Sequence, residues 1–221
     1  VWSADGSMVY FASNRDNLFA VYRKPLSGVG EVEPVVRLDG NSFPESVSPD
    51  GRYLMVLTDG DETGGDMVLV DLQDDGRASV FRSTGFNEGG SIISPDGRWV
   101  AYHSDESGNF EVYVTTFPEP GRRWQISSGN GVYPLWTDGG RQIVYTDFAG
   151  GLAAVRVDGS GETFDVGEEE ALFTAESPEQ GGPYYSVSAD GERFLVVPGV
   201  TQKADTLLNL IVNWPSELDA G

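Results

Sequence analysis

The stretch ISPDGRWVAYHS, residues 93–104, joins a tight-turn sequence to a strand sequence. Asp96-Gly97 is a dipeptide that hairpin turns favour, because glycine adopts positive φ without steric cost. The residues that follow, Trp99 to Tyr102, are apolar in succession, so both faces of the strand carry apolar side chains. A strand of this kind is typical of a sheet covered on both sides. The stretch therefore predicts a hairpin within a stack of sheets.

The same pattern occurs five times along the chain. The other copies are WSADGSMVYFAS from Trp2, VSPDGRYLMVLT from Val47, WTDGGRQIVYTD from Trp136 and VSADGERFLVVP from Val187. The turn glycines are Gly6, Gly51, Gly97, Gly140 and Gly191, in steps of 45, 46, 43 and 51 residues. This spacing is close to the period of propeller blades. We therefore predict an all-β fold, a β-propeller of about five four-stranded antiparallel blades in a single domain of residues 1–221, either as a ring or as part of a larger one.

Further strand-like segments follow the hairpins. We expect third strands at 19–22, 67–70, 110–114, 152–157 and 207–212, and fourth strands at 34–38, 79–82, 123–126 and 171–174. The acidic segment 161–170 is interpreted as an insert in the fourth blade. Because VWSADG begins within a repeat unit, we expect a fragment of a longer protein, in which a strand before Val1 covers the apolar edge of 207–212.

The composition restricts the classes of partner. Acidic residues outnumber basic ones 35 to 14, and the formal net charge is −21. Such a surface repels nucleic acid and anionic lipid. The sequence contains no cysteine, which excludes disulfides and thiolate metal sites, and no run of 18 apolar residues that would span a membrane. We expect a protein or peptide partner, with no nucleic acid and no membrane insertion within these residues.

Two segments resemble known bacterial propellers. YHSDESGNFEVY, residues 102–113, resembles the WD-like repeat of TolB and its relatives. LIVNWP, residues 210–215, is similar to the end of propellers fused C-terminally to bacterial serine/threonine kinases. The resemblance implies a TolB-like propeller in an extracytoplasmic, periplasmic setting. Since this repeat serves binding proteins, peptidase caps and lyases alike, the resemblance specifies the fold better than the function.

Motifs for catalysis are scarce. His103 is the single histidine, and its position in the repeat matches Ala12, Leu57, Thr146 and Val197, which predicts a packed side chain. The sequence has no G-x-S-x-G elbow and no phosphate-binding loop. We therefore predict a non-catalytic binding or sensor module and not an enzyme. The alternative is an enzyme-associated propeller, either a peptidase cap or a divalent-cation-dependent carbohydrate lyase.

A binding rim is expected where the loops between second and third strands meet the connections between blades. Arginine and aromatic residues in a polar surround are favoured at interaction sites. The candidate rim residues are Arg15, Glu45, Glu88, Glu106, Tyr133 and Tyr184. For the two tyrosines the alternative is packing in the channel wall.

A cation site is the other candidate. Asp59, Asp61 and Asp66 lie in a glycine-rich segment with carboxylates at alternating positions, as in calcium loops. The twelfth position from Asp59 is Val70 where an EF-hand has glutamate, so the segment is not an EF-hand. These three residues predict a Ca²⁺ site, and a solvated acidic hairpin is the alternative. No other cofactor is expected.

Overall fold

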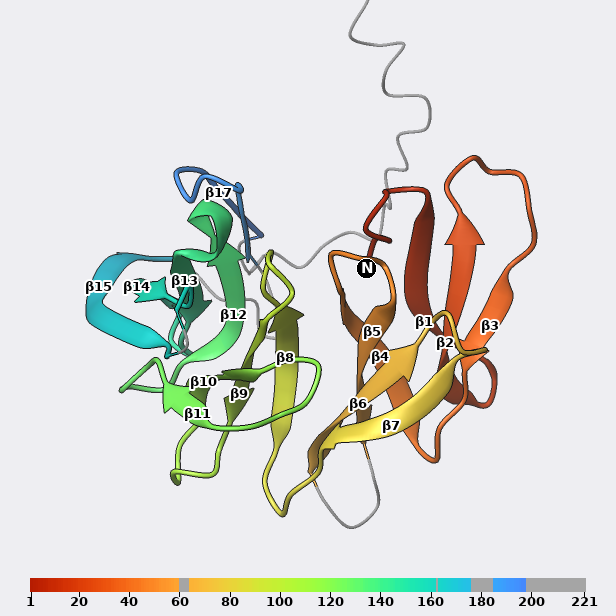
Figure 1. The fold of residues 1–221 in the computed structure, drawn as a ribbon, viewed down its shortest axis with the longest axis horizontal. Coiled ribbons are helices and arrows are strands. Elements are labelled where there is room, and N and C mark those ends of the chain that lie inside the picture. Colours follow the sequence, from red (N-terminus) through yellow and green to blue (C-terminus); the bar gives the residue numbers. More distant parts are fainter. Residues whose placement is uncertain (60–63, 162, 176–184, 198–221) are drawn as a thin grey trace, which may run out of the picture.

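The computed structural model describes residues 1–59, 64–161, 163–175 and 185–197, and it is built from five successive antiparallel sheets (Figure 1). Each sheet is one blade, and the propeller predicted from the repeats is confirmed. Blade 1 comprises β1 (Met8–Asp16), β2 (Leu18–Pro25) and β3 (Glu33–Val36); blade 2, β4 (Asn41–Val47), β5 (Tyr53–Asp59), β6 (Gly65–Asp71) and β7 (Arg77–Arg82); blade 3, β8 (Glu88–Ile93), β9 (Trp99–Ser104), β10 (Glu111–Thr116) and β11 (Arg123–Gln125). Blade 4 comprises β12 (Val132–Thr137), β13 (Gln142–Thr146), β14 (Gly151–Asp158) and β15 (Asp165–Thr174), and the described part of blade 5 comprises β16 (Tyr185–Val187) and β17 (Phe194–Val196).

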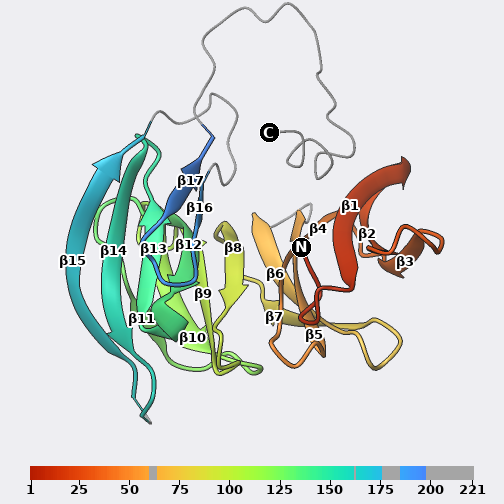
Figure 2. The ribbon, with the colours of Figure 1, turned by 90° about the horizontal axis from the view of Figure 1, so that it is seen from above.

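The blades follow one another around an arc (Figures 1 and 2). The first strands β4, β8 and β12 contact one another in turn on the inner side. In blade 1 the inner position is taken by the chain start, where Trp2 forms an isolated bridge with Val9. The only helix among the described residues is the 3-10 turn η1 (Asp138–Gly140), so no described helix is long and apolar enough to cross a membrane.

The two ends of the blades differ in the kind of connection that they carry. The Asp-Gly turns between first and second strands lie at one end, which we call the turn face. The connections from second to third strand, and from one blade to the next, lie at the other end, which we call the loop face (lower side in Figure 1). This assignment follows from the alternating strand directions.

The turn in blade 3 shows why the Ser-x-Asp-Gly sequence recurs. The Ser94 hydroxyl donates to Asp96 Oδ1, and the Ser94 carbonyl accepts the Gly97 N–H at 2.9 Å. Gly97 has φ +69°, a conformation in which other residues are strained. The Trp99 N–H closes the turn on Ser94 Oγ at 3.0 Å. The same serine–aspartate hydrogen bond recurs at Ser3–Asp5, Ser48–Asp50 and Ser188–Asp190.

Apolar packing lies between blades. Four buried clusters occupy the four seams, and each draws side chains from two consecutive blades. The seam between blades 3 and 4, for example, joins Trp99 to Phe164, whose ring centroids are 4.9 Å apart. The apolar residues that the sequence places on both faces of each second strand fill these seams.

The prediction of an acidic insert at 161–170 is wrong for most of these residues. Residues 165–170 belong to β15, where Glu169 pairs with Val155 and Glu170 with Ala154. Most of β15 is exposed, because it is the outermost strand of its blade. A strand in that place needs no alternation of apolar and polar residues, so its charged sequence resembled a loop.

Candidate functional site

Exposed phenylalanines gather at the loop face. Five phenylalanines of the described residues are exposed, and all of them lie on loop-face connections or in the adjoining ends of strands: Phe19, Phe43, Phe86, Phe148 and Phe173. Leu18 lies beside the first of them and is 54% exposed. We call these six residues the aromatic rim. When a partner covers large apolar side chains that are exposed to water, the free energy of the system falls. A surface that carries several of them therefore marks an interaction site.

Rim residues make ring contacts across the boundaries between blades. Phe19 of blade 1 and Phe43 of blade 2 have centroids 5.4 Å apart. Phe148 of blade 4, which is 61% exposed, meets Phe110 of blade 3 at 5.6 Å. Phe110 in turn packs on His103 at 5.5 Å. The ring contacts of the rim therefore cross two seams, between blades 1 and 2 and between blades 3 and 4.

Asparagine–aspartate pairs hold the loop face in place. Asn41 Nδ2 donates to Asp59 Oδ2 at 2.8 Å, and Asn87 Nδ2 donates to Asp105 Oδ2 at 2.6 Å. Each pair links the start of a first strand to the end of the second strand of the same blade. Asn41 also accepts the backbone N–H of Phe19 at 3.0 Å and so ties blade 2 to the rim of blade 1. The spacing of 18 residues in both pairs is a sequence signal for this feature.

The inner strands carry bulges, and hydrogen bonds link the bulges of consecutive blades. Glu45 lies at the bulge of β4 and accepts the N–H groups of Gly90 and Ser91 in blade 3, at 2.7 and 2.9 Å. The Ser91 hydroxyl also donates to this carboxylate. Burial raises the pKa of Glu45, while these donors oppose the rise. The Glu45 side chain thus joins blades 2 and 3.

His103 lies behind the bulge of blade 4. Its Nδ1 accepts the Tyr133 N–H at 3.2 Å, and the two rings meet edge to face at 5.1 Å. Burial lowers the pKa of His103 to about 4, so the imidazole is neutral at pH 7. This is the packed position predicted from the repeat. Tyr133 itself is half-buried, and its carbonyl accepts the Tyr185 hydroxyl at 2.6 Å.

Glu88 and Glu106, which the sequence analysis assigned to the binding rim, meet in an ion-pair network between blades 2 and 3. Arg82 Nε lies 3.1 Å from Glu88 Oε1, and Arg82 Nη2 lies 2.9 Å from Glu106 Oε2. Arg123 also pairs with Glu106. Glu88 is buried and its pKa is raised by that burial. Both glutamates therefore lie at the loop-face end of a seam, with their side chains turned into the protein.

The other predicted site residues lie apart from this network. Arg15 extends over the rings of blade 1, with its guanidinium carbon 4.4 Å from the Tyr22 centroid. The Asp59 carboxylate accepts a hydrogen bond from Asn41, and the negative charge of Asp66 contributes to the raised pKa of Glu88. Tyr184 and Asp61 lie outside the described residues. Within the ranges that the structure describes, no three His, Asp or Glu residues are arranged to hold a metal ion, so the cation site stays a prediction.

The sequence interpretation missed the aromatic rim. Its phenylalanines stand at strand ends among apolar residues, where hydrophobicity alone does not separate them from core positions. A usable signal was their place in the repeat: Phe19 is the second residue after the Asp16-Asn17 turn, and Phe148 directly follows Asp147 at the end of a second strand. Both places are loop-face positions once the propeller is accepted.

Comparison with known proteins gave matches by structure alone. No family model and no curated protein matches the chain. A TolB of Agrobacterium tumefaciens matches with a TM-score of 0.66 and 21% identity, over 79% of this chain and 64% of the other. TolB of Acinetobacter baumannii matches with a TM-score of 0.64 and 19% identity, over 86% of this chain and 46% of the other. A structure of a nidogen/laminin complex matches with a TM-score of 0.56 and 17% identity, over 70% of this chain and 58% of the other.

The chain thus spans less than two thirds of the length of both TolB proteins. At identities of this size the likeness concerns the backbone arrangement. The blades, their turns and these matches together establish that the chain has the β-propeller fold that it shares with TolB.

Proposed function

We propose that the chain is a non-catalytic module that binds a protein partner through its loop face. The aromatic rim carries the proposal, because it exposes large apolar side chains in blades 1, 2 and 4 and on the connection between blades 2 and 3, in a chain with a formal net charge of −21. Interfaces favour aromatic residues near their centre and polar residues around them. The asparagine–aspartate pairs fix the loops below the rim, which limits the entropy that binding would cost.

The structural neighbours support a binding role. The nidogen/laminin structure is, by its description, that of a complex of two proteins. The TolB resemblance of the repeat supports an extracytoplasmic setting, and the resemblance of 210–215 to kinase-fused propellers supports a sensor role.

His103, packed and neutral, is not placed for acid–base chemistry at the surface. We therefore favour binding over the peptidase-cap and lyase alternatives.

Selection from a displayed peptide library tests the proposal. Peptides selected on the wild-type chain should bind the double variant Phe43→Ser/Phe148→Ser at least about tenfold more weakly, a loss of about 1.4 kcal/mol. The matched control is Leu26→Ser/Val29→Ser, which removes two exposed apolar residues at the turn face. The control should bind the same peptides with unchanged affinity. Equal affinity for all three proteins would contradict a role for the rim.

A further inference from the structure

Three aspartates stand at the loop-face ends of second strands, one each in blades 2, 3 and 4: Asp59, Asp105 and Asp147. Their hydrogen bonds come from neutral donors. Asn41 donates to the first of them, and Asn87 donates to the second. The third accepts the N–H groups of Ala149 and Gly151 at Oδ1, at 2.8 and 2.7 Å. Neutral donors occupy the carboxylate oxygens but leave the negative charge of each group unbalanced.

No ion pair among the described residues reaches these three aspartates. The arginines nearest to the loop face are engaged with other acids. Arg37 pairs with Asp16 in blade 1. Arg82 and Arg123 both pair with Glu106. The positive charges at this end of the molecule are therefore already balanced by other carboxylates.

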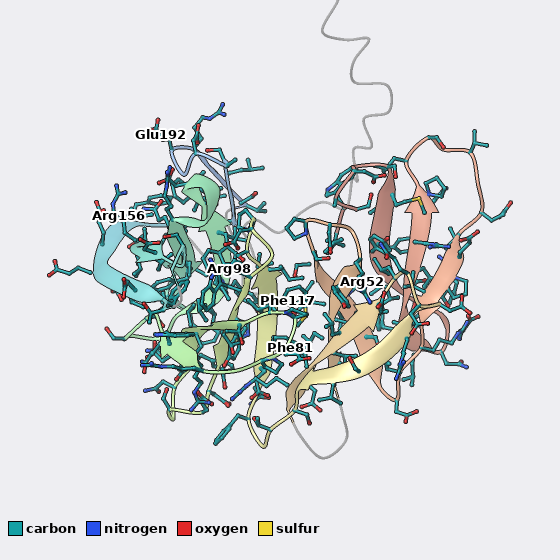
Figure 3. The ribbon with its side chains drawn as sticks, in the orientation of Figure 1. Arg52, Phe81, Arg98, Phe117, Arg156 and Glu192 are labelled. Carbon is teal, nitrogen blue, oxygen red and sulfur yellow. The ribbon has the colours of Figure 1, made fainter. Side chains whose placement is uncertain are left out.

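Other arginines lie away from the loop face of blades 2 to 4. Arg15 extends over the Tyr22 ring of blade 1. Arg52, Arg98 and Arg156 lie toward the turn face (Figure 3). The loop face of blades 2 to 4 thus carries negative charge that the described part of the protein does not itself balance.

Each of the three aspartates is close to one phenylalanine of the aromatic rim. The pairs are Asp59 with Phe43, Asp105 with Phe86, and Asp147 with Phe148. The last two residues are consecutive in the chain. In the other two pairs the link is the asparagine, because Asn41 precedes its phenylalanine by two positions and Asn87 directly follows its own. A phenyl ring attracts a cation to its face, and a carboxylate binds a guanidinium through two hydrogen bonds. Arginine is the side chain that satisfies both partners.

The three pairs belong to one continuous surface, because the loops that carry them touch. A Cβ placed on Gly64 would lie 2.2 Å from Asn87 Oδ1, so the β5–β6 connection of blade 2 contacts the connection to blade 3. Phe110, the last residue of the β9–β10 connection, lies 5.6 Å from Phe148 of blade 4. A single bound segment could therefore run from blade 2 to blade 4 without leaving this surface.

The spacing of the blades sets the spacing of the side chains that would meet these pairs. Packed sheets lie about 10 Å apart, so aspartates of consecutive blades are separated by roughly that distance. A polyproline II segment has three residues per turn and rises about 3.1 Å per residue, so every third side chain lies on one side, about 9 Å from the next. A segment of about seven residues in this conformation presents three arginines at the required spacing.

We propose that the loop face of blades 2 to 4 binds an extended segment of a partner protein that carries arginine at every third position. Each guanidinium lies against a phenylalanine of the aromatic rim and pairs with the aspartate beside it. This inference rests on the proposed function and deepens it by naming the chemistry of the partner. A second copy of the chain fits less well, because its loop face carries the same unbalanced aspartates and its net charge is also −21.

A defined peptide tests the inference. The probe is Arg-Pro-Pro-Arg-Pro-Pro-Arg with blocked termini and a fluorophore, and its binding is followed by anisotropy at about 50 mM sodium chloride, where exposed charges are weakly screened. We expect a Kd of about 1 mM or lower for the wild-type chain. The same peptide with citrulline in place of each arginine keeps the shape and loses the charge. It should bind at least about tenfold more weakly.

A pair of protein variants locates the binding. Asp147→Asn keeps Oδ1 as the acceptor of the two loop N–H groups and removes only the charge. It should raise the Kd of the arginine peptide about threefold, the effect of one exposed ion pair. The matched control is Glu192→Gln, which changes the net charge equally at an exposed turn-face position (Figure 3) and should leave the Kd unchanged. Both variants should retain the circular dichroism of the wild type.

Four outcomes would overturn the inference. The first is absence of binding, and the second is equal affinity for the arginine and citrulline peptides. The third is an equal loss in Asp147→Asn and Glu192→Gln, which would indicate general attraction of a cation to an acidic protein. The fourth is a wild-type dimer that Phe43→Ser/Phe148→Ser dissociates, which would assign the surface to a second copy.

The library selection separates this inference from the proposed function. Selected peptides that depend on Phe43 and Phe148 and are enriched in arginine would support both. Selected peptides that depend on these two residues without an excess of arginine would leave the proposed function standing and contradict the arginine-bearing partner alone.

Discussion

Tyr133 has φ 52°, which is uncommon for a residue other than glycine. Both of its backbone polar groups have partners in other blades, His103 Nδ1 for the N–H and the Tyr185 hydroxyl for the carbonyl. These contacts offset a conformational cost of roughly 1–3 kcal/mol. At the scale of single residues, the inner wall is therefore held by side chains of neighbouring blades. His103 contributes as an acceptor, and this requires the neutral imidazole.

The His103 ring should make stability depend on pH. Its pKa in the folded protein is about 4, below the usual 6.5, so the unfolded chain binds an additional proton between these values. Stability is then lost as the pH falls from 7.5 to 5, by roughly 1–2 kcal/mol from this residue. Urea unfolding at both pH values should show that loss in the wild type and a smaller one in His103→Gln, which keeps an acceptor. The same loss in both proteins would show that His103 does not titrate as inferred.

Catalysis should not depend on this residue. In keeping with its packed position, His103→Ala should lower stability while any measured activity stays within a few-fold. Loss of a chemical step by several orders of magnitude in a folded variant would assign His103 a catalytic role.

At the scale of secondary-structure elements, the loop face depends on the link between the first and second strand of a blade. In blade 3 this link is the Asn87 side chain, whose amide donates to Asp105 while the Asn87 N–H donates to the other carboxylate oxygen at 2.9 Å. Both contacts are exposed, so their loss should affect the connection more than the blade as a whole.

Asn87→Ala should therefore loosen residues 105–110. We expect faster hydrogen exchange there and a fall in the free energy of unfolding of about 1 kcal/mol. Asn109→Ala, on the same connection but outside this link, is the control and should behave as the wild type. Unchanged exchange in Asn87→Ala would show that the pair with Asp105 is dispensable.

The sequence predicted some kinds of element better than others. The hairpins were predicted because Asp-Gly turns encode positive φ locally, as at Gly51 and Gly97. The end of the outer strand β15 was predicted at 171–174, but residues 165–170 were misread as an insert because the exposed edge places no apolar requirement on them. The roles of Glu45 and Glu88 could not be predicted, because each depends on groups in another blade. The repeat gives the order of the blades but not the contacts between them.

At the scale of the whole molecule, net charge opposes the compact state. Acidic groups outnumber basic ones by 21, and many lie on exposed strands such as β15. Salt screens repulsion between exposed charges beyond about 8–10 Å at physiological ionic strength. Interactions buried in the seams should be affected much less.

Stability should therefore rise with salt. Between about 10 mM and 500 mM sodium chloride we expect the free energy of unfolding to increase by at least about 0.5 kcal/mol, measured by urea denaturation at pH 7.5. Glu168→Gln/Glu170→Gln, which removes two exposed charges from β15, should show a smaller increase. A free energy that stays constant or falls with salt would contradict net repulsion.

The four seam clusters have a consequence for how such a protein can change in evolution. Since each cluster is formed by two consecutive blades and none by the molecule as a whole, a blade carries one half of the packing on each of its faces. A duplicated gene segment encoding one 43–51-residue unit would bring both matching halves with it. Repeat number can then change by insertion or deletion of a unit without redesign of a common core. Surfaces such as the aromatic rim, which join several blades, would be extended or shortened by the same event.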